Sequence, residues 1–248
     1  MSLLEIKGLT TEFKTDQGIV KAVRGVDYHV EKGEVLGIVG ESGSGKSQGM
    51  LSLMGLLAGN GKVTSGSITF DGRDLSPNHY TDKKSKKQYE KMIQNIRGNE
   101  ISMIFQDPMS YLNPIVTIEK QMTEGIIYHT KCTKKQAVAR AVELMKMVGI
   151  PAPESRLKQY PFEFSGGMRQ RIIIAIALAN NPKLLIADEP TTALDVTVQA
   201  QILDLIKDLT KKMDAGVILI THDLGVIAEM ADEVVVMYAG RVIEKGTA

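Results

Sequence analysis

The sequence predicts an α/β protein in which helices cover a largely parallel sheet. Short apolar strands alternate with amphipathic helices, and the strand predicted at 35–39 leads directly into a glycine-rich loop. Two further apolar strands, at 184–187 and 217–220, each end in polar residues and flank an amphipathic helix at about 196–212. Ligands bind beyond the carboxyl ends of the strands in such a sheet, so these polar residues are the first candidates for a site.

The N-terminal part predicts a small antiparallel sheet. Segments 3–6, 18–23 and 26–30 are rich in β-forming residues, and segment 66–72 reads as a strand that ends in an Asp-Gly turn. A helix is expected at 47–57, directly after the glycine-rich loop. The lysine-dense segment 82–91 indicates a solvated helical face, with a role in binding nucleic acid as the weaker alternative.

The middle and the end of the chain complete the predicted order of elements. In segment 118–149 apolar residues recur at helical spacing, which predicts a helical lobe inserted between core strands. The residues that carry this spacing are Ala137, Ala141, Leu144, Met145 and Val148. Segments 234–238 and 241–244, joined by Ala239-Gly240, predict a closing hairpin.

Composition limits the classes of protein to consider. With 248 residues, 43% of them hydrophobic, the chain is long enough for one large globular unit with a smaller lobe. The formal net charge of +1 gives no electrostatic reason for nucleic acid or anionic lipid as the main partner, although a local basic patch remains open. The single cysteine, Cys132, excludes an intrachain disulfide and favours a reduced compartment. Because every apolar run is too short to span a bilayer and a signal peptide is not evident, we expect a soluble chain that reaches a membrane only by docking to a partner.

The glycine-rich loop matches the pattern G-x-x-x-x-G-K-[ST] of a phosphate-binding P-loop. Its members are Gly40, Glu41, Ser42, Gly43, Ser44, Gly45, Lys46 and Ser47. The glycines let backbone amides point into one concavity, and the helix N-terminus that follows favours an anion. Lys46 can reach the outer phosphates and the Ser47 hydroxyl can bind Mg²⁺, whereas a glycine-rich turn without a ligand is the weaker interpretation.

Two carboxylates follow the strand at 184–187. We expect Asp188 to hold hydrated Mg²⁺ and Glu189 to polarise an attacking water molecule. If the strand continues to its end, the two side chains point in opposite directions, which suits one metal ligand and one general base. Acidic residues at strand ends often only cap a neighbouring element or face solvent. The P-loop elsewhere in the chain is what favours a functional role for this pair.

A second potential phosphate site lies at Ser165-Gly166-Gly167. Ser165 can cap a helix that begins near Met168, and the two glycines leave amides uncovered, although an ordinary helix cap explains the same residues. One nucleotide has one triphosphate, so two cradles in one chain suggest that the second serves a nucleotide held by another subunit.

Three single residues follow or precede predicted elements. Gln106 follows the strand-like segment 101–105, His222 follows the strand at 217–220, and Asp195 precedes the helix at 196–212. A glutamine there could sense metal or water and a histidine could contact the γ-phosphate. Each has a structural alternative, and Asp195 could be only a helix cap.

Together these motifs resemble the nucleotide-binding subunit of an ATP-binding cassette (ABC) transporter, over nearly the whole chain and in the expected order. The resemblance assigns Gln106 to the Q-loop, Ser165-Gly166-Gly167 to the signature, Ala193-Leu194-Asp195 to the D-loop and His222 to the switch histidine. It implies one ABC ATPase domain, with a P-loop NTPase (RecA-like) core, an antiparallel β subdomain and an inserted helical subdomain. The expected boundaries are about 1–105 and 181–248 for the core with the β subdomain, and about 106–180 for the helical subdomain.

Three stretches narrow the resemblance to the ATPases of bacterial dipeptide and oligopeptide importers, with importers of nickel or other solutes as close alternatives. They are the P-loop residues 41–44, the segment from Gln106 to Pro114, and the segment from Gln159 to Arg171. The same resemblance makes Phe13 the aromatic side chain that stacks on adenine, although by itself Phe13 could be a core residue. A non-transport ABC ATPase is less well supported, because neither a long coiled-coil insertion nor a second cassette is present.

The chain departs from the family pattern at a few positions. Phe164 and Met168 stand where leucine and glutamine are common in the signature, and Gln48 follows Ser47 where threonine or serine is common. We expect these changes to have little effect and count Gln48 among the nucleotide-binding residues. Members of this group usually continue into a cysteine-bearing C-terminal extension that can hold an iron–sulfur cluster, and none follows Ala248, so the chain is expected to be either truncated or unusually short.

The resemblance also implies a working cycle and partners. Two cassettes, either two copies of this chain or this chain and a paralogue, close head to tail on ATP and Mg²⁺. The implied catalytic residues are Lys46, Glu189, Gln106 and His222. The remaining nucleotide contacts come from the P-loop, the signature and Asp195, and Mg²⁺ is held by Ser47, Gln106 and Asp188. The expected partners are permease subunits and, indirectly, an extracytoplasmic solute-binding protein, and the expected location is the cytoplasmic face of the membrane.

Overall fold

The computed structural model describes residues 2–106, 111–192 and 194–248. The chain divides into two compact units, one formed by Met1–Arg97 with Asp214–Ala248 and the other by Gly98–Met213. We refer to them as the first and second unit. The expected boundaries of a helical subdomain at 106–180 remain a prediction.

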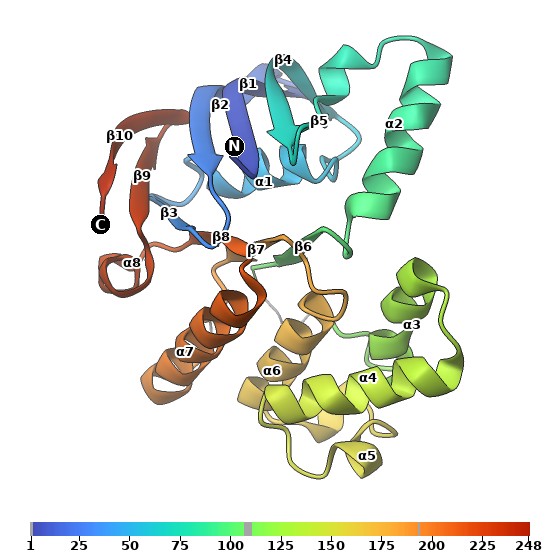
Figure 1. Cartoon of the computed structure of the whole chain (residues 1–248). Helices are drawn as coiled ribbons and strands as arrows, with labels where there is room; N and C mark the ends of the chain where they lie inside the picture. Colours follow the sequence, from blue (N-terminus) through green and yellow to red (C-terminus); the bar gives the residue numbers. More distant parts are fainter. Residues whose placement is uncertain (1, 107–110, 193) are drawn as a thin grey trace. The chain divides into compact units, whose positions relative to one another are not determined.

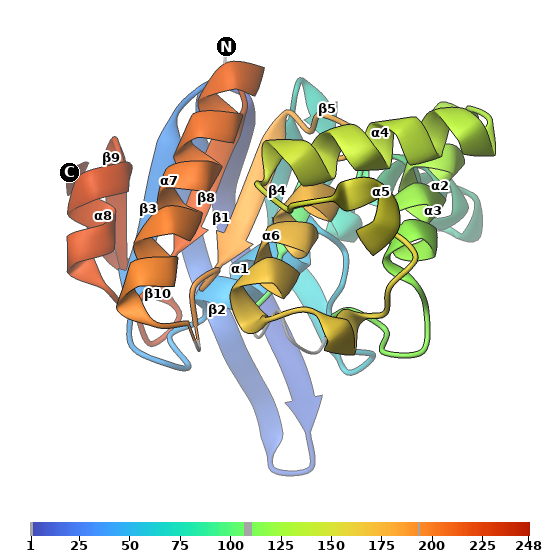
Figure 2. The same cartoon turned by 90° about the horizontal axis from the view of Figure 1, so that it is seen from below.

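The first unit contains the predicted antiparallel sheet, with strand order β2-β1-β4-β5. Its strands are β1 (Leu4–Thr15), β2 (Gly18–Val30), β4 (Gly61–Phe70) and β5 (Arg73–Asp74). β1 and β2 are longer than expected, and β2 runs without interruption through Gly25, where the φ angle is +67° and shifts of register absorb the irregularity. Figure 2 shows the resulting long β1–β2 hairpin.

The second sheet of the first unit is mainly parallel, as predicted. β3 (Val35–Gly40) lies between β8 (Gly216–Ile220) and β9 (Glu233–Tyr238) and is parallel to both. β10 (Arg241–Thr247) pairs with β9 and forms the predicted hairpin (Figure 1).

Two helices contact β3, α1 (Lys46–Leu53) and α8 (Leu224–Met230). A methyl group on Gly37 of β3 would lie 2.6 Å from Ile227 Cδ1, so the missing side chain lets α8 pack closely on the sheet. The helix expected at 47–57 ends earlier, at Leu53, because Gly55 adopts a left-handed φ of +60° and Met54 forms the C-cap.

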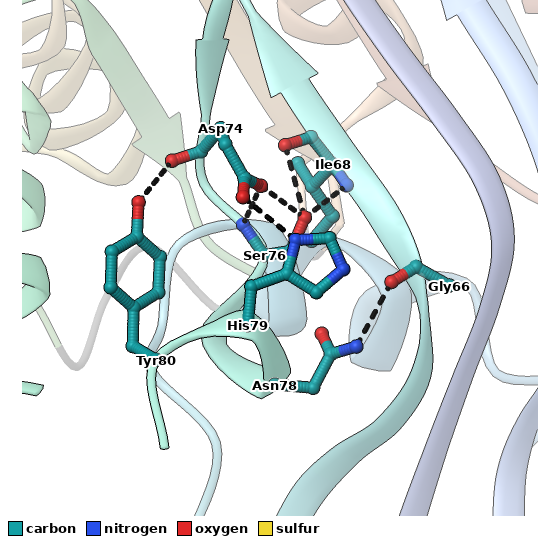
Figure 3. Close-up of polar contacts among 7 residues, drawn as sticks. All are labelled: Gly66, Ile68, Asp74, Ser76, Asn78, His79 and Tyr80. Atoms are coloured by element: carbon teal, nitrogen blue, oxygen red, sulfur yellow. Dashed lines mark hydrogen bonds and ion pairs between the residues drawn. The ribbon is translucent and has the colours of Figure 1, made fainter. Parts of the chain in front are cut away.

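A polar network connects β4 and β5 with the turn η1 (Pro77–His79) (Figure 3). Asp74 accepts hydrogen bonds from the Ser76 amide at 2.9 Å and from the Ser76 hydroxyl, and it pairs with His79 Nδ1 at 2.7 Å. Partial burial opposes ionisation of Asp74, but these hydrogen bonds outweigh it and hold the pKa of the carboxyl below its ordinary value. The Ser76 hydroxyl is fully buried and accepts a hydrogen bond from the Ile68 amide, so the network ties η1 to the sheet.

The lysine-dense segment is helical, as expected, and forms α2 (Lys83–Ile96). Asp82 caps its N-terminus by accepting from the amides of Lys84 and Ser85. At the other end the Arg97 guanidinium donates to the carbonyls of Met54 and Gly55, which connects α2 with the end of α1. The helix therefore has a defined start and a defined end.

In its described residues, the second unit combines a parallel strand pair with six helical elements. The strands are β6 (Ile101–Ile104) and β7 (Leu184–Asp188). The helices are α3 (Ile118–Thr130), α4 (Lys134–Met147), α5 (Pro153–Arg156), the turn η3 (Pro161–Glu163), α6 (Gly166–Ala177) and α7 (Val196–Met213). Within the described ranges, none of these helices, nor any of the first unit, has the length and apolar character needed to span a bilayer.

The helical lobe predicted at 118–149 is present as two helices. Lys131 takes a left-handed φ of +57° at the end of α3, and Thr133 and Gln136 form a capping box at the start of α4. Four of the five residues that carried the helical spacing are buried within α4, and Val148 is buried at its C-cap.

Candidate functional site

The P-loop occupies the turn between β3 and α1, as the sequence predicts. Gly40, Gly43 and Gly45 have φ angles of +153°, +78° and +97°. An added Cβ would lie 2.2 Å from the Met237 carbonyl oxygen at Gly40 and 2.3 Å from the Ala22 carbonyl oxygen at Gly45. The loop therefore needs glycine both for its backbone conformation and for its close approach to neighbouring backbone.

The side chains of the P-loop present polar groups that suit an anion. Lys46 is only 6% exposed, and its Nζ donates to the carbonyls of Gly40 at 2.7 Å and Glu41 at 2.8 Å. The Ser44 hydroxyl is buried without a hydrogen-bond partner among the described atoms, and the N-cap of α1, Gly45, provides no side-chain cap. Ser47 and Gln48 are half-buried in the first turn of α1, whereas Glu41 and Ser42 are exposed.

His222 and the P-loop follow the same edge of one sheet. β3 and β8 are parallel, with Ile38 opposite Ile220, so the loop after Gly40 and the residues after Ile220 leave the sheet at the same level. His222 is exposed, and its neighbours hold the backbone on both sides. Thr221 accepts a hydrogen bond from the Asp223 amide, and Asp223 caps α8.

Phe13 lies on the other sheet of the first unit. It sits on β1 opposite Val20 of β2 and Gly61 of β4. A Cβ on Gly61 would lie 2.5 Å from the Phe13 ring, so the half-buried ring covers the glycine directly. The structure thus gives Phe13 a packing role of its own, and its contact with adenine stays a prediction.

In the second unit Gln106 and Glu189 meet, as expected of residues that follow parallel strands. Ile104 of β6 pairs with Ala187 of β7, and Gln106 Nε2 donates to Glu189 Oε2 at 3.0 Å. The Thr192 hydroxyl donates to the same oxygen at 3.1 Å. Two donors on one oxygen orient the Glu189 carboxylate.

Asp188 and Glu189 differ in backbone and in burial. Asp188 is the last residue of β7 and is 3% exposed. β7 does not continue into Glu189, which has a left-handed φ of +47°. The strand alternation invoked for this pair therefore ends at Asp188, and the turn sets the direction of the Glu189 side chain instead.

Gln170 of α6 is a residue that the sequence analysis missed. Its side chain is completely buried, and its Nε2 donates to the Pro190 carbonyl, one residue after Glu189. The isoleucine run at 172–174, which is buried, could have pointed to Gln170, because a polar side chain buried beside such a run needs a hydrogen-bond partner.

The signature segment forms the start of α6. The helix begins at Gly166, two residues before the expected position, and the Ser165 hydroxyl accepts from the Met168 amide at 3.4 Å, so Ser165 is the predicted cap. A Cβ on Gly167 would lie 2.9 Å from Val198 Cγ1 of α7, which explains one glycine by helix packing.

Asp195 caps α7, which is the structural alternative that the sequence offered for this residue. Its Oδ1 accepts from the Val198 amide at 3.0 Å. Ala193 of the expected D-loop and residues 107–110 of the expected Q-loop segment lie outside the described residues. The candidate residues thus form two sets, with Phe13, the P-loop and His222 in the first unit and Gln106, the signature, Asp188, Glu189 and Asp195 in the second.

Comparison with known proteins decides the family. A family model described as ABC transporter matches residues 23–192, from within β2 to the turn after Glu189. The chain belongs to the ABC transporter family. This ABC chain is 58% identical over 246 residues to the oligopeptide transport ATP-binding protein OppD of Bacillus subtilis (strain 168), covering 99% of the chain and 66% of the relative. It is 52% identical over 246 residues to the dipeptide transport ATP-binding protein DppD of the same organism, covering 99% of the chain and 70% of the relative.

Solved structures support the fold of this ABC chain. The dimeric structure of MJ0796, a bacterial ABC transporter cassette, matches with a TM-score of 0.82 at 29% identity and covers 98% of both chains. A dimeric post-hydrolysis state of the same cassette, bound to ADP and Pi, matches equally well. The predicted fold class, a P-loop NTPase with an antiparallel sheet and an inserted set of helices, is confirmed.

Proposed function

We propose that this chain is the ATP-hydrolysing subunit of a bacterial importer of dipeptides or oligopeptides. The observation that carries the proposal is the identity of 52–58% over 99% of the chain with relatives named for dipeptide and oligopeptide transport. The chain spans 66% of the length of that OppD, so the activity of the whole protein is part of the proposal.

Three features of the P-loop fit a bound triphosphate. Its positive-φ glycines leave room for phosphate oxygens, the Ser44 hydroxyl is buried without a partner among the described atoms, and Lys46 is already held at the loop. We assign triphosphate binding to Gly40–Ser47, with Gln48 beside it, and adenine stacking to Phe13. Bound ATP supplies the phosphoryl bond to be hydrolysed, and Mg²⁺ neutralises phosphate charge.

Oxygen ligands for Mg²⁺ are assigned to Ser47, Asp188 and Gln106. Mg²⁺ in nucleotide sites is usually bound by one or two carboxylates together with phosphates and water, so a dense cluster of carboxylates is not needed. Asp188 suits this role because its carboxylate is held at the end of β7 in a buried position.

Glu189 is the proposed general base. Gln106 and Thr192 orient its carboxylate, so that it can accept a proton from a water molecule positioned for attack. His222 is assigned to contact the γ-phosphate from the first unit. Lys46 stabilises negative charge that develops on the outer phosphates.

The signature residues are assigned to a nucleotide bound by a second cassette, either a copy of this chain or a paralogue. Ser165, Gly166 and Gly167 open α6 with a helix N-terminus, which favours an anion, and Asp195 at the start of α7 belongs to the same contact. The proposed partners are permease subunits and, indirectly, a solute-binding protein. The proposed location is the cytoplasmic face of the membrane.

ATP hydrolysis by the purified chain with Mg²⁺ tests the enzymatic part. We expect Glu189→Gln to lower kcat by about 10²–10⁴-fold while sparing ATP binding, since a positioned base contributes that much. Lys46→Ala should weaken ATP binding itself. Glu124→Gln, an equal change at an exposed position of α3, is the matched control and should hydrolyse ATP at the normal rate. Undiminished turnover in Glu189→Gln would remove this residue from the base role.

Uptake by proteoliposomes that contain this chain with its permease and binding protein tests the substrate. We expect ATP-dependent uptake of a labelled dipeptide or oligopeptide that the Glu189→Gln chain does not support. Uptake of Ni²⁺ with none of peptide would contradict the peptide assignment and leave the ATPase assignment intact.

A further inference from the structure

The lysines of α2 are gathered on one side of the helix. Lys83, Lys84, Lys86, Lys87 and Lys91 are all exposed, and at 100° per residue they occupy an arc of about 160°. Tyr89, Ile93 and Ile96 lie outside this arc, and both isoleucines are buried. We call the exposed side the lysine face.

Charge on this face is concentrated and only partly compensated, because Glu90 is the one acidic residue of α2. α2 holds five lysines and one acidic residue, Glu90, for a net charge of +4. Since the whole chain carries +1, the residues outside α2 carry −3. Among the described residues, no carboxylate lies within ion-pair distance of these five lysines. Lys83, Lys86, Lys87 and Glu90 line a common pocket, so three of the lysines lie near one another with a single carboxylate among them.

The arrangement works against the helix that carries it. Lys87 is three or four residues from Lys83, Lys84 and Lys91, and like charges at these spacings repel. Four of the lysines also lie in the N-terminal half of α2, where the helix dipole disfavours cations, and the first turn contains no acidic residue. Stability of the fold therefore does not account for the lysine face.

The helix presents this face in a fixed orientation. Asp82 caps its start, Tyr89 packs on Tyr80 with ring centroids 5.1 Å apart, and Arg97 bonds to two carbonyls at the end of α1. Figure 1 shows α2 at the outer edge of its unit, beside β4 and β5. The helix backbone thus holds the five exposed lysines on one side of α2.

We propose that the lysine face of α2 binds the anionic headgroups of a phospholipid bilayer. The proposal rests on the proposed function, which places the chain beside a membrane permease. Clusters of four to eight basic residues on an amphipathic helix are attracted to anionic lipid, and the lysine face has five.

The chemistry of the face favours lipid over nucleic acid. It contains lysines and no arginine, so it lacks the planar fork that grips phosphates of nucleic acids in a fixed geometry. It also presents no aromatic side chain for base stacking, because Tyr89 faces the other way onto Tyr80. The binding expected is electrostatic, without insertion of side chains into the hydrocarbon.

Sedimentation with vesicles tests the proposal on the full chain without ATP or permease. Vesicles of phosphatidylcholine with 40% phosphatidylglycerol are compared with pure phosphatidylcholine, at roughly 0.05 and 0.5 M salt. The test variant is the triple change Lys84→Gln, Lys87→Gln and Lys91→Gln. The matched control removes three exposed lysines elsewhere, with Lys32→Gln, Lys120→Gln and Lys135→Gln, and so changes the net charge equally.

The chain should bind the anionic vesicles at low salt and bind neither the neutral ones nor the anionic ones at high salt. Each lysine near an anionic surface strengthens binding roughly 5-fold, so the triple variant should lose on the order of 100-fold and the control little. Absence of binding to the anionic vesicles, equal losses in both variants, or no loss in the test variant would overturn the proposal in favour of a merely solvated face. Tighter binding of single-stranded DNA at equal phosphate concentration would overturn it in favour of nucleic acid. ATP hydrolysis by the same two variants, expected to be normal, separates this result from a failure of the proposed function.

Discussion

Replacing Gln170 by leucine tests how the catalytic turn is held. The change removes the hydrogen bond to the Pro190 carbonyl, one residue after Glu189, and leaves that buried acceptor without this donor. Loss of such a bond costs about 1–3 kcal/mol. Leucine has a similar volume, and it also removes the buried Gln170 Oε1, which has no partner among the described atoms, so about 1 kcal/mol is regained.

The net expectation is a loss of up to about 2 kcal/mol in the free energy of unfolding, measured by urea denaturation. Because a loosened Pro190 lets the adjacent Glu189 carboxylate move, kcat for ATP should also fall by about 10- to 100-fold, with KM much less affected. Gln88→Leu on the exposed side of α2 is the matched control and should change neither quantity. A stable Gln170→Leu chain with normal kcat would refute the positioning role of Gln170.

Three further predictions concern packing and the polar network. Gly37→Ala places a Cβ 2.6 Å from Ile227 Cδ1 and should lower the free energy of unfolding by about 1–3 kcal/mol, and adding Ile227→Val, which removes that methyl, should recover part of the loss in urea titrations. Asp74→Asn should lose about 1 kcal/mol at neutral pH, an estimate that allows for the exposure of the pair with His79. Folding lowers the pKa of Asp74, so the stability difference between the two chains should be complete above the pKa of the unfolded chain, near 3.8. It should disappear as the pH falls through the pKa of the folded chain. A stability difference that does not depend on pH would contradict this prediction. Arg97→Lys should destabilise the chain by about 1–2 kcal/mol, because lysine cannot bond to both the Met54 and Gly55 carbonyls in the geometry of the guanidinium group; thermal unfolding at an unchanged temperature would oppose this.

The part of the site that lies in local backbone was predictable from sequence. The P-loop needs glycine at positions where a Cβ would clash with a carbonyl oxygen. The glycine pattern of the motif shows this requirement in the sequence. The proximity of Gln106 and Glu189 follows from their positions after two neighbouring parallel strands, which end at the same edge of the sheet.

Contacts between distant segments were not predictable. Gln170 and Pro190 are 20 residues apart and belong to a helix and a turn, so no spacing rule connects them. The conformation of Glu189 was hidden for a related reason, since strand alternation predicts the side-chain direction only while the strand lasts, and β7 ends one residue earlier. The break between α3 and α4 depends on a left-handed lysine, a residue type that gives no turn signal.

ATP-dependent dimerisation of the Glu189→Gln chain, followed by light scattering with Mg²⁺ withheld, tests the central claim most directly. If the P-loop of one subunit and the signature of another share a nucleotide, twice the monomer mass should appear only with ATP. Adding Ser165→Arg, which puts a long side chain at the start of α6, should abolish the dimer. A dimer that forms without ATP, or that survives Ser165→Arg, would contradict the shared site.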